Sequence, residues 1–331
     1  MMKIGLVDAD SHNFPNLPLM KISAWHKSKG DAVEWWMPLY RYDTVYVSKV
    51  FGDEYTELDM TVIQADKIVY GGTGLAIKVV DGKEIYEKAD DPTLPDEIEH
   101  IYPDYGLYPE LTRDTAYGFL TRGCPNNCAF CCVSKKEGLV SHKVADLSEW
   151  WNGQKNIVLL DPNILACRQH LELLEQLAAS GARVDFTQGL DARFVTDKNL
   201  EVLTRIKIKT VHFAFDFMKN EKRIIEGLML AKDKLNITDR DAIVYVLTNF
   251  DTTIQDDLYR VAAIKKAGFS PDVRIYRKTS VPKRHILRDL QRWCNNRILY
   301  RSSSFFDYVP RADGRTIREQ YGDILKNCVE V

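Results

Sequence analysis

Short apolar runs alternate with amphipathic segments along most of the chain. Near the N-terminus, the amphipathic segment 18–29 places Leu19, Ile22 and Trp25 on the same side, which predicts a helix. The apolar runs around it predict buried strands at 3–9, 32–36, 44–48 and 67–70. Strands that alternate with helices indicate a parallel sheet with right-handed crossovers.

From Thr115 onward the alternation becomes regular and predicts six strand–helix units. The predicted strands are 115–120, 156–160, 183–187, 210–215, 242–247 and 272–276. The predicted helices are 147–152, 167–180, 198–206, 221–234 and 256–267. This repeated alternation places the chain in the α/β class.

Two other segments flank this regular region. Residues 75–113 contain four prolines and scattered acidic residues, which predicts a connector that wraps the next domain without regular structure. The tail, 281–331, is basic at first, and 286–300 predicts a helix with Trp293 on its apolar face. The domains we expect are therefore 1–74, 75–113, 114–280 and 281–331.

Composition excludes some function classes. The 331 residues are 45% hydrophobic and 28% charged, with a net charge of −2, so overall charge favours neither nucleic acid nor an anionic membrane. No apolar run approaches the ~20 residues that a membrane span needs, and the N-terminus reads as a strand rather than a signal peptide. The seven cysteines suit a reducing compartment, so we expect a cytoplasmic protein.

The most informative stretch is residues 123–132, which holds four of the seven cysteines. Cys124, Cys128 and Cys131 have the spacing C-x3-C-x2-C. Three thiolates on one loop can ligate three irons of a [4Fe–4S] cluster and leave the fourth open to a small molecule. A structural zinc site is less favoured, because the remaining single cysteines form no second pair. Cys132 is the surplus cysteine, with either a packing role or that of a fourth ligand.

This stretch resembles the cluster loop of the radical S-adenosylmethionine (radical SAM) superfamily. Phe130 fills the place of the aromatic residue before the third cysteine, and the lead-in 121–125 is also similar. The resemblance implies a [4Fe–4S] cluster, S-adenosylmethionine as cofactor and an electron donor such as flavodoxin or ferredoxin. It implies reductive cleavage to a 5′-deoxyadenosyl radical that abstracts hydrogen from a substrate. For residues 114–280 it implies a partial (β/α)6 barrel.

The same resemblance assigns contacts to S-adenosylmethionine. Gln188, Asp191 and Arg193 follow the third strand of the core, where the superfamily offers groups to the ribose and the carboxylate; an Arg can bind a carboxylate through two nitrogens. Asn249 lies in the segment that corresponds to the adenine-binding strand. Asp161-Pro162-Asn163 stands where many members have a glycine-rich stretch. Asp and Asn at strand ends also serve as helix caps, and we expect about half of them to do only that.

Residues 1–74 resemble the Rossmann-like, cobalamin-binding-like domain that precedes the core in one branch of the superfamily. The resemblance rests on the strand pattern and on Gly71-Gly72 after the fourth strand, where glycine would let a ligand approach the backbone. A tight turn explains these glycines equally well. His12 follows the first strand as in cobalt-binding loops, but Pro15 stands where those loops have glycine. A cofactor-free relic of the domain is at least as well supported as cobalamin binding.

These observations leave three functions open. The first is a radical SAM enzyme of unassigned reaction and substrate, with a cobalamin-dependent methyltransferase as a variant. The second is a non-catalytic iron–sulfur protein that carries electrons or senses iron or oxygen, with Cys132 closing the cluster. The third is an RNA-modifying radical SAM enzyme, suggested by basic residues near Trp293, Phe305 and Phe306. A solvated helix face is the favoured interpretation of that basic tail, so RNA is not the favoured partner.

Overall fold

The computed structural model describes residues 1–57, 61–238 and 241–331. The chain divides into two compact units, Met1–Arg183 and Val184–Val331. It is an α/β protein with a four-stranded and a six-stranded parallel sheet, so the predicted fold class is confirmed at this level. The domain boundaries expected at residues 74, 113 and 280 stay predictions.

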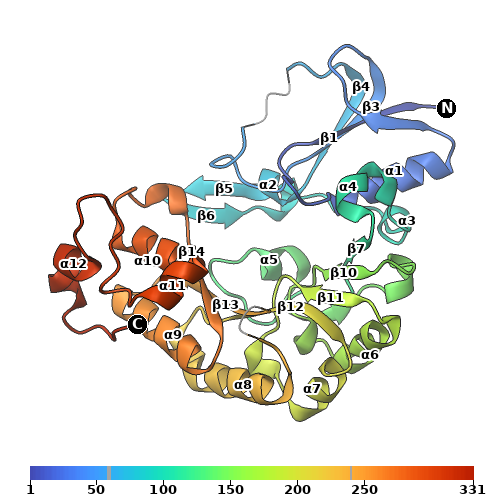
Figure 1. The fold of residues 1–331 in the computed structure, drawn as a ribbon. Coiled ribbons are helices and arrows are strands. Elements are labelled where there is room, and N and C mark those ends of the chain that lie inside the picture. Colours follow the sequence, from blue (N-terminus) through green and yellow to red (C-terminus); the bar gives the residue numbers. More distant parts are fainter. Residues whose placement is uncertain (58–60, 239–240) are drawn as a thin grey trace. The chain divides into compact units, whose positions relative to one another are not determined.

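The four-stranded sheet has the order β2-β1-β3-β4, and all its strands are parallel (Figure 1). Helix α1, Leu17–Ser28, connects β1 to β2 and begins at the N-cap Asn16. The strands are β1 Lys3–Asp8, β2 Ala32–Trp35, β3 Tyr42–Ser48 and β4 Ala65–Gly71. All four predicted strands and the predicted helix are present. The strand order changes direction between β1 and β3, which is where ligands bind in many such sheets.

Apolar clusters lie on both faces of the two central strands, β1 and β3. On one face Ile4 and Leu6 of β1 pack with Leu19 and Ile22 of α1. The other face holds a second apolar cluster, of which Tyr42, Val45 and Val47 of β3 are the buried members. Burial in this sheet is therefore concentrated at the central strands β1 and β3, while every residue of β2 and β4 is at least partly exposed.

The prediction that residues 75–113 lack regular structure is wrong, whereas their role as a connector stays a prediction. Strands β5 and β6 form an antiparallel hairpin whose turn is Asp81-Gly82, both with positive φ. An Asp-Gly pair between apolar residues is a strong hairpin signal, and the prolines mark only the breaks between short elements. The elements are α2 Thr73–Ala76, β5 Ile77–Val80, β6 Lys83–Tyr86, η1 Lys88–Asp90, α3 Asp96–Glu99, η2 Tyr105–Leu107 and α4 Pro109–Thr112.

The rest of the first unit contains the cysteine loop. Its elements are β7 Thr115–Gly118, β8 Thr121–Arg122, α5 Val133–Glu137, β9 His142–Lys143, η3 Leu147–Glu149, β10 Asn156–Leu159, η4 Ile164–Ala166 and α6 His170–Ser180. The helix predicted at 147–152 is only a 3-10 turn, held by a capping box between Asp146 and Glu149. The strand predicted at 115–120 ends at Gly118, because the N–H groups of Leu120 and Thr121 bond a side chain instead of a neighbouring strand.

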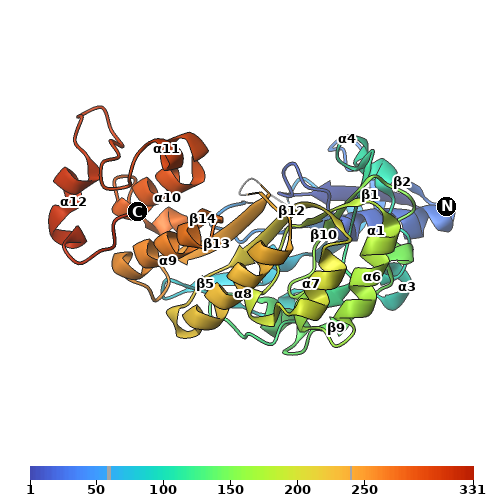
Figure 2. The ribbon, with the colours of Figure 1, turned by 60° about the horizontal axis from the view of Figure 1, so that its bottom comes forward.

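The second unit contains most of the six-stranded sheet, whose order is β14-β13-β12-β11-β10-β7. Helices α8 and α9 lie on one face of its strands (Figure 2). The elements are β11 Arg183–Phe186, η5 Ala192–Phe194, α7 Asp197–Leu203, β12 Lys207–Ala214, η6 Met218–Asn220, α8 Glu221–Lys234, β13 Ala242–Thr248, α9 Ile254–Lys266, β14 Ser270–Ile275 and η7 Lys278–Ser280. Each strand and helix predicted here is present within a few residues.

The tail forms three helices, α10 Ile286–Asn295, α11 Arg297–Ser302 and α12 Ile317–Leu325. The single helix predicted at 286–300 is broken at Asn296, whose side chain accepts hydrogen bonds from the first N–H groups of α11. Trp293, Phe305 and Phe306 are buried, so they cannot stack on RNA bases. Across the described ranges, no helix is both long and apolar enough to cross a membrane.

Candidate functional site

The cysteine loop connects β8 to α5 and is irregular, apart from a turn in which the N–H of Cys131 donates to the carbonyl of Cys128 at 3.0 Å. All four cysteines of the loop are partly exposed, and Phe130 is half-buried beside them. Cys132 stands at the N-cap of α5, but its side chain makes no capping hydrogen bond. The thiols are therefore presented by a loop whose shape depends on how its two ends are held.

The start of the loop is fixed by Asp161, which follows β10 and is 3% exposed. Its carboxylate accepts hydrogen bonds from the N–H of Leu120 at 2.8 Å and from the N–H and hydroxyl of Thr121 at 2.6 and 2.5 Å. Burial raises the pKa of Asp161 to about 7, although these hydrogen bonds and the charge of Arg122 act to lower it. Asp161 is thus neither a helix cap nor a free ligand group, and it anchors the lead-in to the cysteines.

The two ends of the loop are joined by Glu137, the last residue of α5. Its carboxylate accepts a hydrogen bond from Nη1 of Arg122 at 2.8 Å and another from the N–H of Gly123 at 3.1 Å. The N–H of Cys124 donates to the carbonyl of Gly138 at 3.1 Å. A β-carbon on Gly123 would lie 2.3 Å from the carbonyl oxygen of Val140, and φ here is +84°, so only glycine fits.

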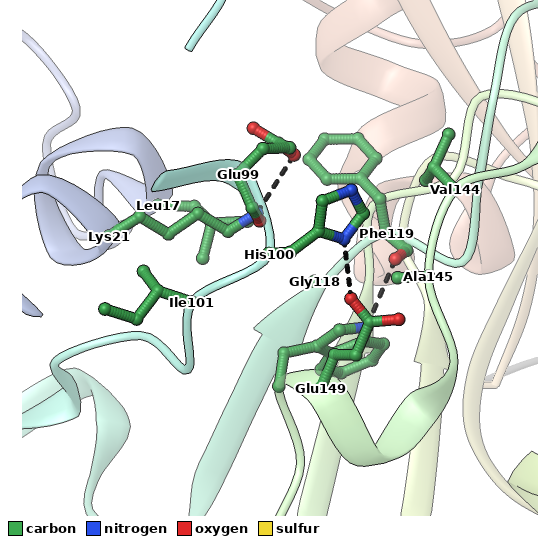
Figure 3. A pocket seen from close by; sticks show the side chains of 11 residues that line it. Leu17, Lys21, Glu99, His100, Ile101, Gly118, Phe119, Val144, Ala145 and Glu149 are labelled. Carbon is green, nitrogen blue, oxygen red and sulfur yellow. Dashed lines mark hydrogen bonds and ion pairs between the residues drawn. The ribbon is translucent and has the colours of Figure 1, made fainter. Parts of the chain in front are cut away.

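An ion-pair chain continues from Arg122 to helix α1. Glu99 Oε1 lies 3.3 Å from Nη2 of Arg122 and 2.9 Å from Nζ of Lys21. Burial alone would raise the pKa of Glu99, but the two cations lower it overall. Figure 3 shows Lys21 and Glu99 pointing toward each other beside a cavity of about 10 Å³. That volume holds about one water molecule, so this pocket is too small for a substrate.

An amide side chain reaches the sulfur of the loop's first cysteine. Nδ2 of Asn163 lies 3.7 Å from Sγ of Cys124, and the hydroxyl of Ser141 donates to the backbone carbonyl of Asn163 at 2.8 Å. Hydrogen bonds to ligating sulfurs are among the features by which a protein tunes an iron–sulfur cluster. The Asp-Pro-Asn sequence after β10 therefore supplies an anchor for the loop and a donor to its first cysteine.

The thiols of the loop are chemically suited to ligate an iron–sulfur cluster. Three thiols with the spacing of Cys124, Cys128 and Cys131 lie on one loop that is closed at both ends and has an amide donor at one sulfur. The portion of the chain that the structure describes contains no group of three or more His, Cys, Asp or Glu side chains already arranged to hold a metal ion. A cluster would therefore have to draw the three thiols together.

The residues assigned to S-adenosylmethionine belong to the second unit. Asp191 and Arg193 form a two-point ion pair, with Nε and Nη2 of Arg193 at 2.8 and 2.7 Å from the carboxylate oxygens. Asp191 also accepts from the N–H of Arg193, so its role as a cap is observed. Gln188 is exposed, and Nδ2 of Asn249 donates to the carbonyl of Tyr276 at 2.8 Å. Binding a ligand through Asp191, Arg193 or Asn249 would require exchange of these contacts.

Gly71, the last residue of β4, and Gly72, which follows it, have different surroundings. A β-carbon on Gly72 would lie 2.2 Å from the carbonyl oxygen of Lys49, so the chain itself occupies the space beside this residue. Gly71 has nothing within 4 Å of the corresponding position. His12 is exposed and has a φ of +37°. Close packing against the loop after β3 is therefore enough to explain Gly72, whereas a ligand role for Gly71 stays a prediction.

Comparison with known proteins adds no assignment: no protein-family model and no curated protein matches the chain.

Proposed function

We propose that the chain is a radical SAM enzyme that holds a [4Fe–4S] cluster through Cys124, Cys128 and Cys131. The bound cluster supplies the electron that cleaves S-adenosylmethionine to methionine and a 5′-deoxyadenosyl radical, which abstracts hydrogen from a substrate. The protein's own tasks are to bind, orient and shield the reactants. The core would be a partial (β/α)6 barrel, preceded by a Rossmann-like domain that needs no cobalamin for this chemistry.

The observation that carries the proposal is the closed cysteine loop. Asp161 fixes the residues before it, and Glu137 joins its two ends through Arg122 and Gly123. A cluster site needs thiols held at a constant spacing while one iron stays accessible, and a short, anchored, partly exposed loop supports both requirements. The parallel α/β architecture supports it further, because active sites of such folds lie at the carboxyl ends of the strands.

For S-adenosylmethionine, Arg193 is the residue we expect at the carboxylate, since a guanidinium binds a carboxylate through two hydrogen bonds. Two N–H groups of that guanidinium donate to the carboxylate of Asp191, so binding a ligand there would require these hydrogen bonds to exchange. Asp191 and Gln188 would then accept hydrogen bonds from the ribose hydroxyls. Phe130 would cover the cluster, and the backbone near Asn249 would bind the adenine.

The test uses anaerobically purified protein with a reconstituted cluster. S-adenosylmethionine and dithionite are added, and 5′-deoxyadenosine and methionine are measured by mass spectrometry, with and without hydroxocobalamin. We expect both products without cobalamin, their loss in Cys128→Ala and their retention in Cys328→Ala, a single cysteine far from the loop in sequence. Cleavage that persists in Cys128→Ala would refute the proposal.

The same experiment distinguishes a cobalamin-dependent methyltransferase from the function proposed above. Such an enzyme would give methylation only with hydroxocobalamin. A non-catalytic electron carrier would keep its cluster but give no product, and the EPR spectrum of a closed four-cysteine cluster would not change on addition of S-adenosylmethionine. RNA modification predicts salt-dependent RNA binding. Lys283, Arg284, Arg292, Arg297 and Arg301 are exposed basic residues of the tail that such binding would use.

A further inference from the structure

A row of polar side chains crosses one face of strands β11 to β14. Asp185, His212, Tyr245 and Arg274 come from four successive strands. Their strand neighbours Val184, Phe213, Val244 and Val273 are fully buried. Phe213 packs edge-on against Phe269, which follows α9. Because side chains alternate between the two faces of a strand, the polar row lies on the face opposite these apolar residues.

Three members of the row, His212, Tyr245 and Arg274, contact one another through the ring of Tyr245. The rings of His212 and Tyr245 are parallel within 3°, with centroids 5.0 Å apart. The guanidinium of Arg274 lies 5.1 Å from the centroid of the Tyr245 ring. Nε of Arg274 is 2.7 Å from Oδ1 of Asp272, and Asn295 donates to the same oxygen at 3.2 Å. These contacts fix the positions of the imidazole and the phenol and leave Asp272 satisfied.

Asp185 is different. Its Oδ1 is buried and has no hydrogen-bond partner among residues 1–57, 61–238 and 241–331. Burial raises the pKa of this carboxyl, while the positive charge of Lys209 acts to lower it. A buried carboxylate oxygen without a partner costs free energy that a packed core would avoid. Such a group is expected where a ligand completes the hydrogen bonding.

His212 presents a second acceptor on the adjacent strand. Its Nδ1 lies 3.1 Å from the carbonyl oxygen of Phe186, which can only accept. Nδ1 is therefore the donor of this contact, and in that tautomer Nε2 is the ring nitrogen that accepts. The row thus offers a carboxylate oxygen and an imidazole nitrogen to one ligand.

We propose that Asp185 and His212 bind a protonated amino or guanidino group of a small molecule on this face of the sheet. The cationic N–H groups donate to Oδ1 of Asp185 and to Nε2 of His212. Calling this molecule the substrate rests on the proposed radical SAM function, but the binding itself does not. The substrate class that follows is an organic cation with at least two N–H donors.

The binding test uses the full chain without cluster or S-adenosylmethionine. Agmatine and 1,4-diaminobutane are the cationic probes, and glutarate is an anionic probe of similar length; binding is measured by isothermal titration calorimetry. We expect at least one cation to bind while glutarate does not. Asp185→Asn should weaken that binding roughly tenfold or more, because a charge-assisted hydrogen bond is lost. The control Asp197→Asn, exposed at the start of α7, should bind like the unmodified chain.

A stability measurement separates a ligand site from a purely structural carboxylate. If Asp185 has no protein partner, Asp185→Asn removes a buried charge and should leave the urea midpoint unchanged or raise it. A lower midpoint with unchanged cation binding would show that Asp185 serves the fold and would overturn the proposal. Absence of binding by both cations at millimolar concentration would also overturn it. Because no cluster is present, neither result bears on whether the chain cleaves S-adenosylmethionine.

Discussion

The carboxylate of Asp161 holds both the N–H and the hydroxyl of Thr121, at 2.6 and 2.5 Å from Oδ2. These residues are 40 positions apart, and the bonds fix the chain three residues before the first cysteine of the loop. The carboxyl is fully buried, so the same contact that orders the loop also places a titratable group in a low-dielectric site. Loop geometry and proton binding are therefore linked at this point.

We expect the stabilising contribution of Asp161 to decrease as the pH rises. Its pKa is raised by burial from 3.8 to about 7, so between these values the folded chain keeps a proton that the unfolded chain releases. The contribution is complete below about pH 4 and is lost as the pH passes through about 7. At about 1.4 kcal/mol per pH unit, the loss over about three units is about 4 kcal/mol.

Urea unfolding of the unmodified chain and of Asp161→Asn, measured from pH 4 to 8, checks this expectation. The Asn side chain does not titrate, so the difference between the two free energies of unfolding isolates the carboxyl. A difference that grows with pH would mean that the three hydrogen bonds to the carboxylate outweigh its burial.

The role of Asp161 also illustrates what the sequence predicts and what it does not. Apolar periodicity predicted the strand before it, and position alone placed an acidic side chain at the strand end. Whether that side chain caps a helix, binds a ligand or anchors another loop depends on a partner far away in the sequence. In the same way, the spacing of the cysteines indicated a cluster loop, whereas Glu137 and Glu99 carried no local signal of their ion pairs with Arg122.

The Gly123→Ala and Gly138→Ala variants should differ although both glycines have positive φ. Both pay the conformational penalty of about 1–2 kcal/mol for alanine in the left-handed region. Only at Gly123 does the added carbon meet a neighbour, the carbonyl oxygen of Val140 at 2.3 Å, while Gly138 has open space. We expect Gly123→Ala to lower the free energy of unfolding by more than Gly138→Ala and to lose iron after reconstitution. Equal iron content in the two variants would argue against a tight loop entrance.

Glu137→Gln should impair cluster loading without unfolding the chain. The substitution removes the negative charge opposite Arg122 and turns an N–H donor toward that guanidinium, which weakens a charge-assisted bond worth about 1.5–3 kcal/mol. Iron and sulfide per chain after reconstitution are the measurement, with circular dichroism to verify folding. Glu172→Gln is the matched control, since Glu172 pairs with Lys143 outside the loop. Iron content that falls equally in both variants would show that the effect is not specific to the loop.

In the second unit the buried cation of Arg260 joins the carboxyl ends of two strands. Its guanidinium is fully buried and donates to the carbonyls of Phe215 and Asp216 after β12, at 2.8 and 2.9 Å, and to that of Leu247 in β13 at 2.9 Å. It also bonds Asp257, its counterion one turn earlier in α9. Burial raises the pKa of Asp257 to about 6, and the charge of Arg260 opposes this. At neutral pH the carboxyl of Asp257 is therefore mostly ionised and supplies the negative charge that balances Arg260.

Asp257→Asn should lower the free energy of unfolding by about 3–5 kcal/mol, because it leaves the buried guanidinium without a counterion. The double variant Arg260→Met with Asp257→Leu should lose less, since it removes both charges, although three carbonyls then lack a donor. Urea unfolding of the single variants, the double variant and Glu226→Gln, which breaks an exposed pair with Lys222, measures the coupling. If Asp257→Asn is no less stable than Glu226→Gln, the carboxyl does not balance Arg260, and hydrogen bonds to backbone carbonyls alone retain the cation.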